Sequence, residues 1–386
     1  MTKQLFPLAL GGLGIGTTEF VIMGLLPDVA NDLAISIPVA GHLISAYALG
    51  VVVGAPILVA LSAKFPPKYV LITFMILFTF FNALSIIAPD YNTLLMSRFF
   101  AGLPHGAFFG VGTVVAAKLA KEGKAAQAIA SMFTGLTVAN LAMVPLVTYI
   151  GHHLHWRYAF GIVSLLGLLT ITFLYLWMPK LKSLKSVTFK EEIEFFKTIK
   201  AWHILSIVII GFGGLFAWFS YIAPLLIHVS KFDPSTVSYL MIVAGAGMVV
   251  GNIMGGYFSD KKDPVKVIIT ILFLMIIFLV FVFLFSENKI ISIILTFICG
   301  VLSMSMGTPI SMIMLKNAKH SEMLGAAFVQ ASFNVANSIG AFVGGIPLIF
   351  GLSFNYPSLV GAGIATLGLI LTISFYKKYK YWIFAL

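Results

Sequence analysis

Three ionisable side chains, Glu19, Arg98 and His105, stand inside long apolar runs of this sequence. A carboxyl in such a run is costly to bury, and residues of this kind in membrane spans commonly mark paths for ions or protons. An imidazole can exchange a proton near neutral pH, whereas a guanidinium stays charged and must find acceptors. The three residues therefore predict a site for proton coupling, with structural hydrogen bonding between helices as the alternative.

Helical spacing indicates which way Glu19 faces. Gly12, Gly16, Glu19 and Met23 follow one another at intervals of four, three and four residues, so they share one face of a helix. Small residues on a helix face allow a neighbouring helix to approach closely. We therefore expect this carboxyl to face the interior of the protein and not lipid.

Arg98 and His105 share a helical face in the same way, seven residues apart. A buried arginine needs an acceptor, and Glu19 is the only buried acid that the sequence offers. Backbone carbonyls at a broken helix end near Pro104 are the other option. For His105, packing or hydrogen bonding is favoured over proton transfer.

Polar and aromatic side chains in later apolar runs are candidates for a substrate cavity, where aromatic faces and amides can bind a small solute. Packing between helices is the alternative for each of them. The candidates are Asn140, Phe216, Phe219, Tyr221, Gln330, Asn334 and Asn337.

Several other patterns resemble metal or phosphate sites but lack residues that such sites need. The histidines His152, His153 and His155 have no acid or cysteine beside them in the sequence, so no metal site is expected. The glycine-rich segment 11–16 lacks the lysine of a phosphate loop, and no Walker sequence is present. Cys299 is the single cysteine, so the chain cannot form an internal disulfide. We expect no cofactor and no enzymatic activity, with a proton gradient as the energy source.

The composition identifies the elements that must hold these residues. Of the 386 residues 60% are hydrophobic and 10% are charged, and the mean hydropathy is +1.05. Soluble domains carry about 25% charged residues, and a bilayer core takes about 20 apolar residues per helix. The fold class is therefore an all-α polytopic membrane protein. The predicted spans are 5–27, 40–62, 69–88, 93–118, 125–150, 157–178, 202–228, 236–258, 266–286, 289–315, 323–350 and 356–376.

The basic residues predict an orientation. Of the 24 Lys and Arg, twenty fall on one side of the predicted spans, three on the other, and Arg98 within a span. Basic residues concentrate in cytoplasmic loops, so both termini and the segment 179–201 are expected in the cytoplasm. The net charge of +11 is thereby explained without a nucleic-acid partner.

An internal repeat divides the chain. Gly50-Val-Val-Val-Gly54 matches Gly247-Met-Val-Val-Gly251, and Val138-Ala-Asn140 matches Val335-Ala-Asn337, both at an offset of 197 residues. We therefore predict two six-helix halves, 1–178 and 202–386, joined by a charged cytoplasmic linker at 179–201. Transporters built from such repeats bind their substrate between the halves near the membrane midplane.

The chain resembles the major facilitator superfamily, and within it the twelve-span drug:proton antiporters and their arabinose efflux permease subfamily. The motifs that carry the resemblance lie at 16–24, 46–56, 98–112, 216–221 and 324–327. The resemblance implies the major facilitator fold, alternating access and a role in proton transfer for Arg98. It also implies cytoplasmic gating loops, here at Lys64 and Lys68 and at Asp260 and Lys261.

Two motifs depart from the family pattern. Ala63, Lys64 and Pro66 stand where the first gating loop usually has an acid, a base and a glycine, and the acid is kept only as Asp260. In the fifth span Val144-Pro145 replaces the usual Gly-Pro.

The leading functional hypothesis is proton-coupled efflux of a small solute, such as a drug-like compound or a sugar. We expect a monomer in the bacterial inner membrane. Proton-coupled uptake, lipid translocation and a membrane-embedded enzyme or sensor are the alternatives, in that order.

Overall fold

The structure is a computed structural model that describes residues 2–35, 37–62, 64–181, 194–318 and 321–383. These residues form helices and no strands. Within them, twelve helical segments are long and apolar enough to cross a membrane, which confirms the all-α membrane fold. Ala63 and positions 182–193, most of the predicted linker, lie outside the described residues.

The chain forms two compact units. The first unit comprises residues 1–195 with 318–331, and the second comprises 196–317 with 332–386. The expected halves ended at 178 and began at 202, and they assigned 318–331 to the second half.

The helices of the first unit are α1 (Phe6–Asp32), α2 (Ile37–Ser62), α3 (Pro67–Ile87), α4 (Tyr91–Leu119), α5 (Ala125–Val138), the π-helical turn η1 (Ala139–Met143), α6 (Val144–His153) and α7 (Arg157–Trp177). The short helix η2 (Phe195–Lys197) lies at the boundary. The second unit has α9 (Ile199–Ser206), η3 (Ile207–Phe212), α10 (Gly213–Phe219), α11 (Ile222–Pro224), η4 (Leu225–Val229), η5 (Pro234–Thr236), α12 (Val237–Lys261), α13 (Pro264–Phe285), α14 (Lys289–Ser305), α15 (Gly307–Asn317) and α17 (Tyr356–Ile383). Helix α16 (Glu322–Ile349) is divided between the units.

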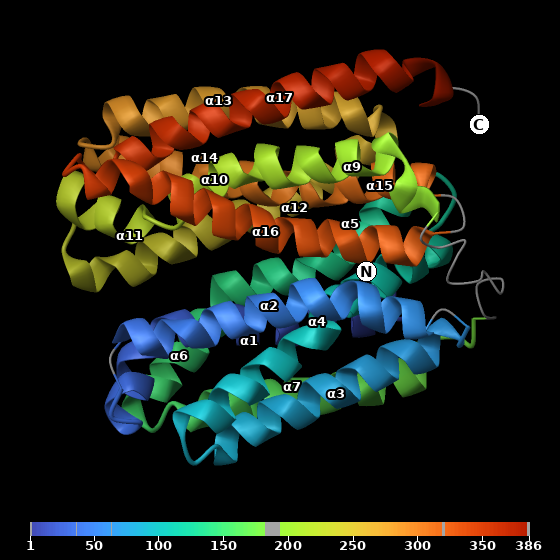
Figure 1. Ribbon diagram of the computed structural model, residues 1–386, viewed down its shortest axis with the longest axis horizontal. Coiled ribbons are helices and arrows are strands. Elements are labelled where there is room, and N and C mark those ends of the chain that lie inside the picture. The colour runs from blue at the N-terminus through green and yellow to red at the C-terminus, as the bar shows by residue number, and fades with distance from the viewer. Residues whose placement is uncertain (1, 36, 63, 182–193, 319–320, 384–386) are drawn as a thin grey trace. The chain divides into compact units, whose positions relative to one another are not determined.

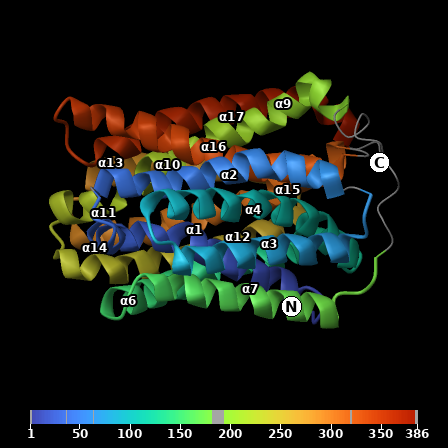
Figure 2. The same cartoon turned by 60° about the horizontal axis from the view of Figure 1, so that its bottom comes forward.

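In the first unit α1 is the central helix, in contact with α2, α5, α6 and α7. Helix α4 packs against α2 on one side and α3 on another. Helices α3 and α7 run side by side in both views (Figures 1 and 2). This arrangement brings residues of α1, α2 and α7 into contact with the buried Arg98 of α4.

Glycines allow α2 and α4 to cross in backbone contact. A Cβ atom on Gly50 would meet the Phe99 carbonyl oxygen, and one on Gly102 would meet the carbonyl oxygen of Tyr47. Small residues permit this approach in lipid, where no hydrophobic effect drives helices together. The crossing fixes which side chains of α2 face α4.

The second unit repeats this crossing between α12 and α14. A Cβ on Gly247 would meet the Phe297 carbonyl oxygen, and one on Gly300 would meet the carbonyl oxygen of Ala244. These contacts match those of the first unit at offsets of 197 residues in the first helix and 198 in the second. The repeat in the sequence is therefore also a repeat of helix contacts.

Three of the twelve spans are interrupted in the described part of the chain. The fifth span contains η1 just before Pro145, the seventh contains η3 and a separate break at Ser220 and Tyr221 before Pro224, and the tenth breaks at Met306 before Pro309. Proline has no N–H to donate and its ring displaces the preceding turn. A widened turn or a break accommodates that displacement.

Candidate functional site

Arg98 is held inside the first unit by α1. Its side chain is fully buried, at 0% exposure. Nη1 donates to the Thr18 hydroxyl at 2.8 Å and Nη2 donates to the Thr18 carbonyl at 3.0 Å. Both charge-assisted hydrogen bonds therefore end on one residue of α1.

Neither acceptor expected from the sequence binds Arg98. Glu19 forms no hydrogen bond or ion pair in the part of the chain that the structure describes. Pro104 lies within the continuous helix α4, so no broken helix end exists there. A backbone carbonyl does accept from Arg98, but it belongs to Thr18 on a neighbouring helix.

Two aromatic rings complete the surroundings of the Arg98 guanidinium. Its Cζ atom lies 4.4 Å from the centre of the Tyr47 ring and 5.5 Å from that of Phe160. The face of an aromatic ring attracts a cation, and more strongly when water is excluded. Nε of Arg98 has no hydrogen-bond partner among the described residues. The groups in direct contact with the guanidinium are thus neutral, and no acid among the described residues forms an ion pair with it.

The Thr18 hydroxyl extends this hydrogen-bond network to α3. While it accepts from Arg98, it donates to Oδ1 of Asn82 at 2.6 Å. The Asn82 amide in turn donates to the Phe78 carbonyl at 2.8 Å. Each hydrogen bond has a defined direction, so the network joins α1, α3 and α4 in one arrangement.

Tyr47 connects Arg98 to His105. The Tyr47 hydroxyl lies 3.1 Å from Nδ1 of His105, and both side chains are buried. We refer to Thr18, Tyr47, Asn82, Arg98 and His105 as the Arg98 cluster. Sequence reasoning missed Tyr47, Thr18 and Asn82. For Tyr47 a signal was present, because it precedes Gly50 and Gly54 by three and seven residues and so shares their face of α2.

Glu19 lies beside the Arg98 cluster but outside its hydrogen bonds. Gly12 and Gly16, on the same face of α1, pack against Leu136 and its neighbours in α5, as the glycine stripe predicted. The Glu19 side chain itself is only half-buried, and Met23 on the next turn is 41% exposed. Glu19 is close enough to Arg98 to interact with its charge.

The cavity candidates are placed as follows. Phe216, Phe219 and Asn337 are half-buried, and Gln330 and Asn334 are buried. Asn140 is half-buried, and its amide donates to the Leu136 carbonyl at 3.1 Å within its own helix. The Tyr221 hydroxyl donates to the Ala341 carbonyl at 2.8 Å, so this residue ties the seventh span to α16.

Lys68 differs from its expected place in a gating loop. It lies in the first turn of α3, and its Nζ donates to the carbonyls of Tyr175 and Met178, each at 2.7 Å. It therefore satisfies carbonyls at the C-terminal end of α7, where a cation is also favoured by the helix dipole. A lysine bound in this way acts as a structural tie between two helices.

The other gating candidates are more accessible. Lys64 is exposed in the segment between α2 and α3. Asp260 and Lys261 form the last turn of α12, and the Lys261 ammonium donates to the Tyr257 hydroxyl.

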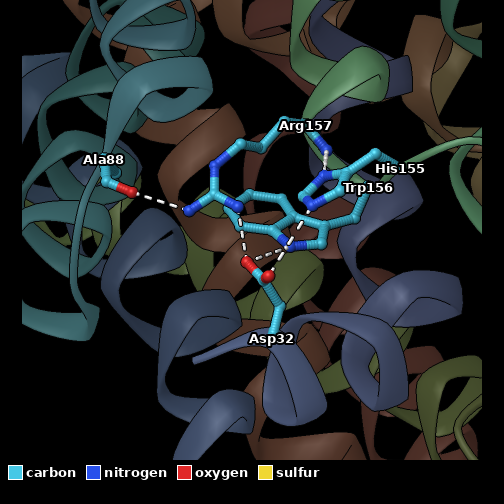
Figure 3. A network of polar contacts seen from close by, with 5 residues as sticks. All are labelled: Asp32, Ala88, His155, Trp156 and Arg157. Atoms are coloured by element: carbon cyan, nitrogen blue, oxygen red, sulfur yellow. Dashed lines mark hydrogen bonds and ion pairs between the residues drawn. The ribbon is translucent and has the colours of Figure 1, made fainter. Parts of the chain in front are cut away.

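A second polar cluster joins the C-terminal end of α1 to the start of α7 (Figure 3). The Asp32 carboxylate accepts from Arg157 and, at 3.0 Å, from Nε1 of Trp156. Arg157 also donates to the Ala88 carbonyl at 2.9 Å, and Nε2 of His155 lies 3.6 Å from Asp32. We call these five residues the Asp32 cluster.

The structure places acids of α1 beside two of the histidines His152, His153 and His155, which have no acid near them in the sequence. Besides the His155–Asp32 contact, Nδ1 of His152 lies 2.7 Å from the Asp28 carboxylate. Helix α1 supplies both acids from far away in the sequence. Among the described residues no group of three or more His, Cys, Asp or Glu side chains has the geometry for a metal ion.

Comparison with known proteins identifies similar sequences over the whole chain. The model of the Major Facilitator Superfamily matches residues 8–345, with a second match over 233–381. The protein AraJ of Escherichia coli (strain K12) is 37% identical over 380 residues, which is 98% of this chain and 96% of AraJ. A Helicobacter pylori protein named "Probable sugar efflux transporter" is 30% identical over 380 residues, covering 97% of this chain and 96% of that protein.

Two solved structures share the fold. The proton:xylose symporter XylE superposes with a TM-score of 0.77 at 14% identity, covering 96% of this chain and 95% of XylE. A variant of the E. coli fucose:proton symporter FucP superposes with a TM-score of 0.75 at 14% identity, covering 96% of this chain and 97% of FucP.

Proposed function

Since the chain belongs to the major facilitator superfamily and is a membrane transporter, we propose that it exports a small solute in exchange for protons. We further propose that the solute is a sugar or a compound of similar size and polarity. Relatives named as sugar efflux transporters, 30% identical to this chain, support this choice.

The observation that carries the proposal is the state of Glu19. It is a carboxyl within a membrane span, it is half-buried, and it has no hydrogen-bond or ion-pair partner in the described residues. Structural carboxyls in spans are paired or hydrogen-bonded. An accessible carboxyl without a partner can instead take up a proton from one side and release it to the other.

Arg98 supplies a fixed positive charge close to Glu19. Thr18 and Tyr47 hold the guanidinium through contacts that do not involve Glu19. The positive charge of Arg98 attracts an ionised carboxylate at Glu19 and has no such attraction for a protonated one. A solute that interacts with the ionised carboxylate would bind less well after protonation, and this coupling is reciprocal. That competition is what antiport requires.

We also propose that the transporter works as a monomer in the bacterial inner membrane with both termini in the cytoplasm. A 37% identical E. coli O157:H7 relative is named an inner membrane transport protein, and the basic residues favour this orientation. A cytoplasm-active reporter fused after Leu386 should be active and a periplasm-active one silent. The reverse result would contradict the orientation.

The proposed function is tested with purified protein in liposomes. Labelled pentoses and hexoses are loaded inside, a pH step is imposed, and sugar flux and proton flux are both followed. We expect Glu19→Gln to lose the pH-driven flux while keeping slow exchange of sugar down its own gradient. Glu287→Gln, at an exposed acid between α13 and α14, is the matched control and should behave as wild type.

Two results would contradict the proposal. Equal pH-driven flux in wild type and Glu19→Gln would show that Glu19 is structural and that protons move elsewhere. A wild-type protein that moves sugar with the proton, from outside to inside, would show symport instead of antiport.

A further inference from the structure

Tyr47 contacts two of the ionisable residues of the first unit, Arg98 through its ring and His105 through its hydroxyl. We infer that Tyr47 is a positioning residue of the transport cycle, which holds the Arg98 guanidinium with its ring and sets the hydrogen bond of His105 with its hydroxyl. The inference rests on the proposed proton-coupled function and adds a residue to it.

The geometry gives Tyr47 two separate contacts. The ring centre lies 4.4 Å from Cζ of Arg98. The hydroxyl lies 3.1 Å from Nδ1 of His105. Only 2% of Tyr47 is exposed, so water does not compete for either contact. The ring contact needs an aromatic face, and the second contact needs a hydroxyl.

The backbone of Tyr47 is held in place independently of these contacts. Its carbonyl lies directly against Gly102 of α4, and Gly50 on the next turn lies against the Phe99 carbonyl. These close approaches locate the Tyr47 Cα relative to Arg98 and His105, which are on the same helix as Gly102. The side chain therefore has little freedom to leave either partner.

The second unit shows that the helix crossing does not itself require a tyrosine. Through the repeat of helix contacts, Tyr47 corresponds to Ala244, Arg98 to Thr296 and His105 to Ser303. Ala244 makes the same contact with Gly300 that Tyr47 makes with Gly102. The same crossing thus forms with an alanine, and the tyrosine occurs in the unit that has the arginine and the histidine. The ring and hydroxyl of Tyr47 contact Arg98 and His105, and the packing of α2 on α4 does not depend on them.

The Tyr47 hydroxyl can pair with Nδ1 of His105 in either direction. When Nδ1 is unprotonated it accepts from the Tyr47 hydroxyl, and when Nδ1 carries a proton it donates to the Tyr47 oxygen. The charged and titratable groups around Tyr47 are Glu19 on α1 and Arg98 and His105 on α4. The elements α3 and α7 contribute the neutral residues Asn82 and Phe160 to the surroundings of Arg98. A change in the protonation of His105 therefore changes the hydrogen bond of the Tyr47 hydroxyl.

The test compares Tyr47→Phe with wild type in the liposome assay between pH 5.5 and pH 8. Phenylalanine keeps the ring over Arg98 and removes the hydroxyl. We expect the maximal rate of pH-driven sugar flux to fall about threefold to tenfold, the range for losing one buried hydrogen bond, with a displaced pH profile and little change in KM. Tyr47→Leu, which also removes the ring, should lower the rate further.

Tyr91→Phe is the matched control. Tyr91 also pairs its hydroxyl with a histidine, Nδ1 of His42 at 3.2 Å, but at an exposed site. Its rate and pH profile should equal those of wild type. A structural role for Tyr47 would lower the amount of folded protein without displacing the pH profile.

Non-additivity gives a second readout. If Tyr47 acts through His105, His105→Gln should displace the pH profile as Tyr47→Phe does, and the double variant should add no further change. A Tyr47→Phe profile that superimposes on wild type, or fully additive effects in the double variant, would overturn the inference. If wild type itself shows no pH-driven flux, the proposed function is wrong, and the inference fails with it.

Discussion

Replacing Thr18 by valine removes one hydroxyl at nearly constant volume and tests the network around Arg98. In the structure this hydroxyl accepts from Nη1 of Arg98 at 2.8 Å and donates to Asn82 at 2.6 Å. Thr18, Asn82 and Arg98 are each 0% exposed, so water cannot replace the lost partner. The variant leaves a second guanidinium nitrogen of Arg98 unsatisfied, in addition to Nε.

The expected loss of stability follows from these two hydrogen bonds. A hydrogen bond to a charged group contributes about 1.5–3 kcal/mol and a neutral one about 0.5–1.5 kcal/mol. Thr18→Val should therefore lower the free energy of unfolding by about 3 kcal/mol. The hydrogen bond from Nη2 to the Thr18 carbonyl is unaffected by the substitution. Arg98 should consequently stay in place, and the loss should not extend to the whole network.

The assay is denaturant titration in detergent micelles, followed by tryptophan fluorescence. Thr172→Val is the matched control, because the Thr172 hydroxyl is exposed and bonds only to the Leu168 carbonyl of its own helix. That variant should change stability by less than about 0.5 kcal/mol.

A double-mutant cycle isolates the contact between Thr18 and Arg98. Thr18→Val and Arg98→Met should show a coupling energy of about 1.5–3 kcal/mol, the range for a hydrogen bond to a charged group. Additive effects, within about 0.5 kcal/mol, would mean that Arg98 does not donate to Thr18 and would refute the description of the cluster.

Further predictions concern other contacts between helices and the cap of α4. Lys68→Met should lower the free energy of unfolding by about 3 kcal/mol, because Nζ donates to two carbonyls at the end of α7; a loss below about 0.5 kcal/mol would contradict this role. Gly102→Ala should sharply reduce the yield of folded protein, because its Cβ would collide with the α2 backbone, whereas Gly363→Ala, where nothing lies within 4 Å, should not. Asp32→Asn should cost about 1 kcal/mol or less, since the ion pair with the arginine of α7 is partly exposed, and high salt should shrink the difference from wild type. The Asp90 carboxylate caps α4 by accepting from the backbone N–H of Thr93, and this hydrogen bond holds the pKa of Asp90 below its usual 3.8. The stabilising effect of this hydrogen bond is therefore present above pH 3.8 and is lost as the pH falls through the lower pKa of the folded protein. When the pH is lowered below about 4, Asp90→Asn should lose less stability than wild type, because it has no carboxylate to protonate.

The spans could be predicted because the property that defines them is local. In lipid each helix must satisfy its own backbone groups and present apolar side chains, so the hydropathy of about 20 residues is sufficient. The interruptions at Pro145 and Pro309 were less predictable. Pro104 lies within a span too, yet α4 continues through it.

The same reasoning explains why Arg98 and Glu19 could be recognised as special from the sequence. A charge in an apolar run is costly wherever its helix packs, so its type and depth already indicate a function. Glu19 was one of two acceptors considered for Arg98, and it forms no hydrogen bond or ion pair with Arg98 among the described residues. Thr18, one residue earlier on α1, points at Arg98 instead.

The sequence by itself determined the membrane class, the twelve spans, the repeat and the ionisable residues within the spans, because each depends on composition over one segment or on a repeated string. Only the tertiary structure decided which side chains meet: Thr18 and Tyr47 around Arg98, and the acids of α1 beside His152 and His155. Those meetings depend on the rotation and crossing of each helix against its neighbours. Rotation and crossing are set by glycine contacts between residues about fifty or more positions apart, such as Gly102 on Tyr47, and not by any local pattern.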